Sequence, residues 1–313
     1  MASALQKYFI APRVPNIAGG FIDDNFALVD LRRRRGGFAI ASSAATKLPD
    51  GIVVPAFDQA NIGRPEELIR IIKQTSEAAG LSNRKRWSIA LPEGAARTFV
   101  IPLESKPAGR RELEEILNWK IERVIAHPAT ELRTSRQRLS PVGGRERYLV
   151  TVAREDVIAE YEATFESIGW QVGLIVPRHL GEAQWLLWDQ TPGDKMLVSG
   201  NRSGFTVVVM RNGEPVMIRV YGCEVDAQMD ELHRSAVYYR DKVESASGKQ
   251  SELTGLLVIG DVDSFEAQKV LADALDRHPS VINPTQFGFD LTGEAIPFDQ
   301  IAGAAGLATL AWQ

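Results

Sequence analysis

The turn with the clearest chemical potential lies at residues 199–204, which read Ser-Gly-Asn-Arg-Ser-Gly. Glycine and serine in a tight turn leave backbone N–H groups free to point at one anion, and Arg202 could add a positive charge. Neither Ser203 nor any other serine stands in a G-x-S-x-G motif, and the chain lacks P-loop, H-E-x-x-H and G-x-G-x-x-G motifs. These residues predict an anion-binding turn without a nucleophile or a catalytic base.

The residue types that bind metals are few and scattered. The chain has one cysteine, Cys223, and four histidines, and their spacing matches no metal-ligand motif. A single cysteine also excludes an internal disulfide framework. We interpret Cys223 as a packed thiol, and we expect neither catalytic residues nor a metal site.

Charge is unevenly distributed along the chain. The 313 residues carry a net charge of −4, which gives no general attraction to nucleic acid. Residues 1–156 hold 25 basic and 18 acidic side chains, a net charge of +7, whereas residues 157–313 hold 11 and 22, a net charge of −11. Such asymmetry can mark a face for anionic lipid or an acidic partner, or simply two differently solvated lobes. The basic half contains runs at 84–86, 110–111 and 133–138.

Localisation signals are not apparent in the sequence. Residues 1–15 lack a basic segment followed by an apolar one, and no apolar run reaches the roughly 18 residues that span a membrane. The segment 301–312, rich in glycine and alanine, is predicted to be a packed helix. We therefore expect a cytoplasmic chain.

Strands and helices alternate in both halves, and each half begins with a hairpin, at 26–44 and 205–220. The other strands are predicted at 86–91, 98–103, 148–153, 171–176, 196–199 and 256–259. Helices are predicted at 65–79, 111–126, 154–168, 179–189, 226–243, 264–275 and 301–312. Four arginines at 32–35 are interpreted as a solvated strand end before a Gly-Gly turn. The repeated order predicts a duplicated fold of the actin-like class, with a nucleotide position between two lobes.

Several stretches, in the same order along the chain, carry a resemblance to a known family. They are 27–37 followed by 47–53, 113–128 ending in Ile-Ala-His-Pro, 148–170, Glu-Leu-His-Arg-Ser at 231–235 with Tyr238 and Tyr239, and Gly-Leu-Ala at 306–308. Together they resemble the PilM family of type IV pilus assembly proteins, in the FtsA/PilM-like branch of the actin-like ATPase superfamily. The resemblance implies an α/β, actin-like (ribonuclease H-like) duplicated fold, with mixed sheets flanked by helices and a small inserted α/β subdomain in the first lobe.

The same resemblance implies a division of the chain. Residues 1–97 would form the base subdomain of the first lobe, to which 171–190 and 301–313 would return. Residues 98–170 would form the inserted subdomain, and 191–300 the second lobe.

Nucleotide-binding loops of the family are altered here. Where the first loop would read Asp-Ile-Gly-x-x-Ser-x-Lys, this chain has Gly20, Ile22 and Ala27 at its aspartate, glycine and lysine positions. The turn holds Asp23 and Asp24, whose carboxylates would repel phosphate unless a metal intervened.

The second loop, Asp-Ile-Gly in the family, aligns with Ser199, Gly200 and Asn201, so its metal-binding carboxylate is missing. The Gly-Gly pair on the adenosine side reads Gly260-Asp261. The candidate cofactor-binding residues are thus Ser199, Gly200, Asn201, Arg202, Ser203 and Gly260. We expect no competent hydrolase, because the preorganised charge for phosphoryl transfer cannot be assembled. No cofactor is expected, although ATP with magnesium stays open.

The resemblance implies a scaffold at the inner face of the inner membrane that binds the N-terminal cytoplasmic peptide of a PilN-like membrane protein. That peptide would lie in a groove bordered here by the 111–126 helix and the 84–91 strand. Trp119 and Arg123 share a face of that helix and are candidate partner-binding residues, or else an ordinary half-exposed face. Other pilus platform proteins and an anionic lipid surface are further candidate partners; nucleic acid is not.

Two alternatives remain. One is an actin-like switch that binds or hydrolyses ATP in the same machinery. The other is the cytoplasmic module of a type II secretion platform, which shares the fold but is normally followed by a membrane span. We expect PilM-like function because the sequence ends at Gln313 without one.

Overall fold

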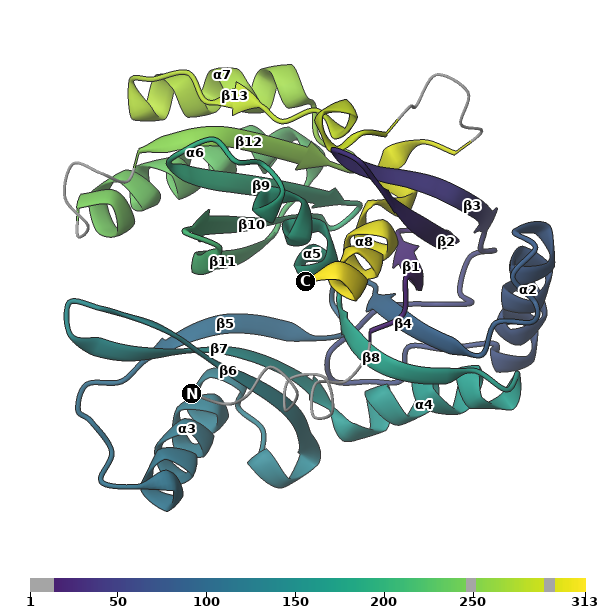
Figure 1. Cartoon of the computed structure of the whole chain (residues 1–313). Coiled ribbons are helices and arrows are strands. Elements are labelled where there is room, and N and C mark those ends of the chain that lie inside the picture. The colour runs from purple at the N-terminus through teal and green to yellow at the C-terminus, as the bar shows by residue number, and fades with distance from the viewer. Residues whose placement is uncertain (1–13, 246–251, 290–295) are drawn as a thin grey trace.

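The first lobe is built on a mixed five-stranded sheet in the order β3-β2-β1-β4-β8 (Figure 1). The computed structural model describes residues 14–245, 252–289 and 296–313. The strands are β1 (Ile17–Ile22), β2 (Asn25–Arg34), β3 (Gly37–Lys47), β4 (Arg86–Leu91) and β8 (Gln171–Pro177). The first three pair antiparallel, while β4 runs parallel to β1 and β8 parallel to β4.

The second lobe repeats this arrangement. Its sheet has the order β11-β10-β9-β12-β13. The strands are β9 (Asp194–Asn201), β10 (Gly204–Arg211), β11 (Glu214–Gly222), β12 (Leu253–Ile259) and β13 (Ser280–Val281). Antiparallel pairing of the first three and parallel pairing of the last two match the first lobe. The prediction of a duplicated fold with equivalent hairpins is therefore confirmed.

Helices cover both sheets. In the first lobe α2 (Pro65–Ala78) and α4 (Glu155–Ser167) share one core with the sheet, and in the second lobe α6 (Gln228–Tyr238) and α7 (Ser264–Leu275) do the same. Proline at the start of α2 and Gly80, with a φ of 67° just beyond its end, explain its bounds. Asp263 caps the start of α7, since its carboxylate accepts hydrogen bonds from the N–H groups of Phe265 and Glu266.

A third core joins the lobes. Helix α8 (Phe298–Thr309) lies beside α5 (Arg178–Glu182) and packs on β1 and β2, in the middle of the molecule (Figure 1). One apolar cluster combines Ile301 and Ala302 of α8 with Val29 of the first sheet and Leu197 and Val208 of the second. Trp185 is fully buried there and donates its indole N–H to the Ala302 carbonyl, 2.9 Å away. The lobes therefore share buried apolar surface.

The small antiparallel sheet lies between β4 and α4 in the chain. It has the order β5-β7-β6, with β5 (Arg97–Pro102), β6 (Leu132–Val142) and β7 (Arg145–Arg154). Helix α3 (Arg110–Ile125) packs Leu117 and Ile121 against one face of it. The side chains of α4 instead join the core of the first sheet, although the sequence-based division counted α4 with the insert. That division stays a prediction.

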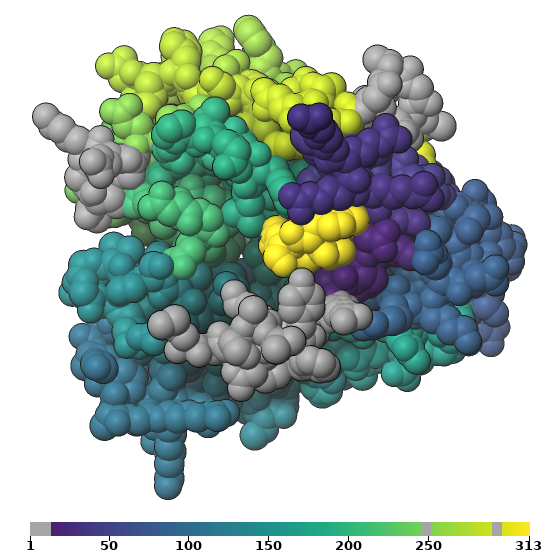
Figure 2. All heavy atoms as spheres, in the orientation of Figure 1, coloured from purple at the N-terminus to yellow at the C-terminus, as the bar shows by residue number. Residues whose placement is uncertain are grey.

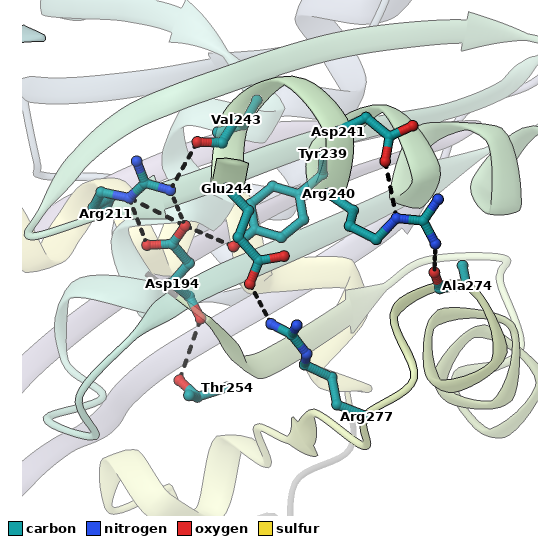
Figure 3. A network of polar contacts seen from close by, with 10 residues as sticks. All are labelled: Asp194, Arg211, Tyr239, Arg240, Asp241, Val243, Glu244, Thr254, Ala274 and Arg277. Carbon is teal, nitrogen blue, oxygen red and sulfur yellow. Dashed lines mark hydrogen bonds and ion pairs between the residues drawn. The ribbon is translucent and has the colours of Figure 1, made fainter. Parts of the chain in front are cut away.

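Buried polar contacts anchor the start of the second lobe (Figure 3). Asp194 opens β9, is almost fully buried, and accepts two hydrogen bonds from Arg211, at 2.8 and 2.6 Å. The Tyr239 hydroxyl donates to the same carboxylate at 2.7 Å. Burial, together with the nearby Asp194 charge, raises the pKa of Tyr239, so its hydroxyl stays a donor. Because these groups satisfy one another, the polar cluster can remain inside the lobe.

Several expected elements differ in extent, and three strands were not predicted. Residues 179–189 form the short α5 followed by a 3₁₀ turn over Ala183–Leu187, and 226–243 form α6 with a 3₁₀ turn before it and a π-helical turn after it. The strands β1, β6 and β13 are additions. Strand β1 contains Gly19 and Gly20, because a Cβ at Gly19 would lie 2.9 Å from Leu28 and one at Gly20 would lie 3.1 Å from Ala90.

Candidate functional site

Two hairpin turns, one from each lobe, meet at the predicted anion-binding position. The β1–β2 turn carries Asp23 and Asp24, and the β9–β10 turn carries Arg202 and Ser203. The backbone N–H of Arg202 donates to Asp23 Oδ1 at 3.0 Å, and its guanidinium lies 2.9 Å from Asp24 Oδ2. The groups that could hold an anion are therefore engaged by carboxylates of the other lobe.

A second cation completes this contact. Lys47 Nζ lies 3.2 Å from Asp24 Oδ2. Partial burial alone would raise the pKa of Asp24, but hydrogen bonds from Lys47 and Arg202 outweigh it and lower the pKa. Asp24 is consequently ionised at neutral pH and holds both cations.

The other predicted residues of the second turn also have partners within the chain. Ser199 is fully buried, and its hydroxyl accepts a hydrogen bond from Arg178 Nη2 at 2.8 Å. The same nitrogen donates to the Gly200 carbonyl at 2.6 Å. The Asn201 side-chain oxygen accepts the N–H of Ser203 at 2.8 Å. These polar groups of the turn are thus hydrogen-bonded to other groups of the same chain.

Gly200 and Gly260 are required by a close crossing of backbones where β9 and β12 end. Gly260 has a φ of 83°, and a Cβ there would lie 2.4 Å from the Gly200 carbonyl oxygen. A Cβ at Gly200 would lie 2.6 Å from Val262. Packing therefore explains both glycines without a ligand.

Beneath the turns lies a buried cluster of charged residues that the sequence did not reveal. His179 Nδ1 lies 2.8 Å from Glu93 Oε1, and Arg178 Nε lies 3.0 Å from Glu182 Oε1. Burial alone would raise the pKa of Glu93, but the charge and hydrogen bonds of His179 lower it to about 2. Glu93 follows β4 and His179 follows β8, so parallel neighbouring strands bring them together. The carboxyl ends of adjacent parallel strands are the signal that could have found this cluster.

The turns and this cluster border a cavity of about 700 Å³, which Asp50, Arg97 and Tyr221 also line. Within the described ranges, no group of three acidic, histidine or cysteine side chains could hold a metal ion. A nucleoside triphosphate at this position would have to displace Asp23 and Asp24 from the donors of the β9–β10 turn.

A separate groove of about 680 Å³ lies between the small sheet and β8. Leu149 and Thr151 of β7 line one side, Leu174 and Val176 of β8 line the other, and Gln313, beyond the end of α8, lines it as well. Strand β8 is the last in its sheet, and no other strand in the described part of the chain pairs with its free edge. The groove therefore offers half-buried apolar side chains beside an unpaired strand edge.

Trp119 and Arg123 lie outside this groove. Trp119 is 56% exposed, and the Arg123 guanidinium lies 5.5 Å from the centre of its ring. Helix α3 packs on the face of the small sheet formed by Tyr148, Val150 and Val152, whereas Leu149 and Thr151 face the groove. Helix α3 does not border this groove, because the small sheet separates them, and the expected peptide groove along α3 stays a prediction. A partner role for the two residues stays a prediction.

Two duplicated sheets whose hairpin turns face each other define the actin-like ATPase fold. The chain is similar to PilM in the PilM–PilN type IV pilus biogenesis complex, with a TM-score of 0.75, 18% identity, and coverage of 96% of this chain and 100% of that one. It is also similar to a Bacteroides thetaiotaomicron protein with an actin-like ATPase fold and unknown function (TM-score 0.52, 12% identity, 91% and 93% coverage). At these identities the similarities show the fold.

The cytoplasmic domain of EpsL, from the type II secretion system of Vibrio cholerae, matches with a TM-score of 0.49, 11% identity, and coverage of 94% and 93%. No family model and no curated protein matches the chain. None of the described helices is long and apolar enough to cross a membrane.

Proposed function

We propose that this chain is a non-catalytic, PilM-like scaffold of type IV pilus assembly. It works in the cytoplasm at the inner membrane and binds the cytoplasmic tail of a PilN-like membrane protein. The observation that carries the proposal is the groove beside the unpaired edge of β8. Similarity over the full length of PilM supports it.

An extended peptide can use this groove in two ways. Its backbone can pair with the free edge of β8, which supplies affinity without regard to sequence. Alternate side chains can then contact the apolar groups of Leu174 and Val176 on one side and Leu149 on the other. A tail with spaced apolar residues is the ligand chemistry that fits.

The non-catalytic part of the proposal is supported by the contact between the two turns. Triphosphate binding would require Arg202 to leave Asp23 and Asp24. The ATP-dependent switch is therefore the less favoured function.

Calorimetry with a synthetic PilN-like tail tests the groove. Thr151→Trp places a neutral, bulky side chain in the groove, and we expect the affinity to fall by about tenfold or more. Ser135→Trp, at an exposed position of β6 on the same groove, is a second variant should the first fail to fold.

Trp119→Ala with Arg123→Ala, on the far side of the small sheet, is the variant that discriminates the two sites, and it leaves the affinity unchanged if the tail binds the groove beside β8. If this variant loses binding and Thr151→Trp retains it, the tail binds α3 instead. A wild-type chain that does not bind the tail would refute the proposal.

A further inference from the structure

Two basic runs, far apart in sequence, meet at one end of the first sheet. Arg32–Arg35 form the end of the β2–β3 hairpin, and Arg84–Arg86 lead into β4. The Leu31 N–H donates to the Asn16 carbonyl at 3.0 Å, and the parallel register of β1 with β4 places Asn16 beside Arg86. Arg84 Nη2 lies 3.3 Å from the Asp30 carboxylate of β2. We call these seven residues the basic end.

The hairpin projects beyond the rest of the sheet. Strands β2 and β3 continue past the start of β1 by about four residues, or roughly 13 Å at the usual rise of a strand. All four arginines of the hairpin are exposed. By strand alternation Arg32 and Arg34 share the face of Asp30, and hence of Arg84. In Figure 2 the dark purple surface of β2 and β3 lies next to the yellow C-terminal segment.

More than half of these cations lack a carboxylate partner among the described residues. In the part of the chain that the structure describes, no carboxylate pairs with Arg32, Arg34, Arg35 or Lys85. Arg33 is held differently, since its guanidinium lies 5.6 Å from the Trp188 ring and donates to the Trp312 carbonyl at 3.4 Å. The basic end thus combines Arg33 and Arg84, which have partners, with four cations that have no carboxylate partner.

The other basic runs are largely neutralised. Arg110 and Arg111 each lie 2.9 Å from a glutamate one helical turn along α3. Arg133 pairs with Glu155 and Glu162, and Arg138 with Glu146. Among the basic runs, most cations at 110–111 and 133–138 are therefore paired with carboxylates, whereas most of those at the basic end are not.

The basic end also lies close to the groove. Arg33 contacts Trp312, and the neighbouring Gln313 lines the groove. A peptide in the groove and a surface against the hairpin would therefore be near each other.

We infer that the basic end docks on an anionic phospholipid bilayer. The tip of the hairpin packs against Phe287 of the second lobe, but its arginine side chains are exposed. Exposed guanidinium groups without a carboxylate partner suit a plane of mobile phosphates, each of which can accept two parallel hydrogen bonds from a guanidinium. The choice of a bilayer over an acidic protein rests on the proposed function, because a chain that holds a membrane protein's tail works within reach of the membrane.

Vesicle co-sedimentation of the full chain tests this inference. The probes are vesicles of phosphatidylcholine alone and of an equal mixture with phosphatidylglycerol. The wild type should prefer the mixed vesicles, and added salt should weaken its binding. Arg32→Gln, Arg34→Gln and Arg35→Gln together should lower the affinity on the order of 100-fold, from the attraction expected per basic residue near such a surface.

The matched control is Arg110→Gln, Arg111→Gln and Arg145→Gln, which removes three exposed charges from the inserted subdomain. It should change the affinity only a few-fold. Equal binding of the wild type to both vesicles, or an equal loss in the control, would overturn the inference. So would a hairpin variant that keeps lipid binding but loses the tail peptide, which would mark an acidic-peptide site. Failure of the wild type to bind the tail, with lipid binding intact, would refute only the proposed function.

Discussion

Arg202 decides what the predicted anion site can do. Its backbone N–H and its guanidinium are the donors that an anion would use, and Asp23 and Asp24 accept both. Two carboxylates of the chain therefore already engage the donors of this turn. The contact exists because the two turns face each other from equivalent hairpins.

Removing these carboxylates should open the site. We expect wild-type protein to show no heat of binding with millimolar Mg-ATP, and Asp23→Asn with Asp24→Asn to bind pyrophosphate or ATP measurably, because Arg202 and Lys47 lose their partners. Calorimetry checks both. Asp50→Asn, on the wall of the same cavity but without an ion pair to Arg202, is the matched control. Tight ATP binding by the wild type would contradict this account.

Glu93 gives the fold a specific acid sensitivity. Burial opposes its ionised form, but the charge and hydrogen bonds of His179 lower its pKa from 4.5 to about 2. Because the folded-state pKa lies below the unfolded one, the stabilisation is present above about pH 4.5 and is lost as the pH falls towards 2. It amounts to about 3 kcal/mol at most.

Urea unfolding at pH 6 and at pH 3 measures this contribution of Glu93 to the free energy of unfolding. The wild type should lose about 2 kcal/mol more than Glu93→Gln between the two pH values, since the amide cannot titrate and the rest of the stabilisation is lost only below pH 3. An identical pH dependence in both proteins would show that the ion pair contributes nothing.

At the scale of elements, the crossing of β9 and β12 depends on two glycines. Gly260→Ala adds a methyl group 2.4 Å from the Gly200 carbonyl at a φ of 83°. Gly36→Ala, at a φ of 89° with no atom within 4 Å, carries the backbone strain alone. We expect about 1 kcal/mol of destabilisation for Gly36→Ala and roughly 1–3 kcal/mol more for Gly260→Ala.

Denaturant midpoints of the two variants separate strain from clash. Equal losses of stability in the two variants would mean that β12 shifts to accommodate the methyl group at no cost in free energy. A larger loss at Gly260, accompanied by weaker packing of the second lobe, is the outcome that the close crossing predicts.

Elements with a clear apolar pattern were predictable, and those that depend on tertiary contacts were not. The hairpins and α7 followed from apolar periodicity and turn residues. Strand β6 was not predicted, because its arginine, serine and glutamine residues, at the edge of a small sheet, show no apolar alternation. The positions of the two turns in the chain were predicted from the resemblance. The ion pairs between them were not, because they depend on how the two lobes pack together. The Glu93–His179 contact needs two strands that about 80 residues separate.

The whole molecule should unfold as one unit. Sheets from both lobes and α8 contribute to the same apolar cluster, so separating the lobes would expose their shared core. All six tryptophans lie outside residues 191–300. Tryptophan fluorescence therefore reports on the first lobe and the shared core, whereas circular dichroism reports on both lobes. We expect the two signals to give the same midpoint in urea. Two separate transitions would show that the lobes are independent.

The contact between the two turns also bears on how this protein responds to the state of the cell. An actin-like protein that needs a nucleotide to bring its hairpins together changes shape with the supply of that nucleotide. Here the side chains of Asp23 and Asp24 contact Arg202 and so connect the two hairpins within one polypeptide. This contact does not depend on the concentration of a ligand. We therefore expect its conformation to be the same in growing and in starved cells, so that any timing of the process it serves must come from another component.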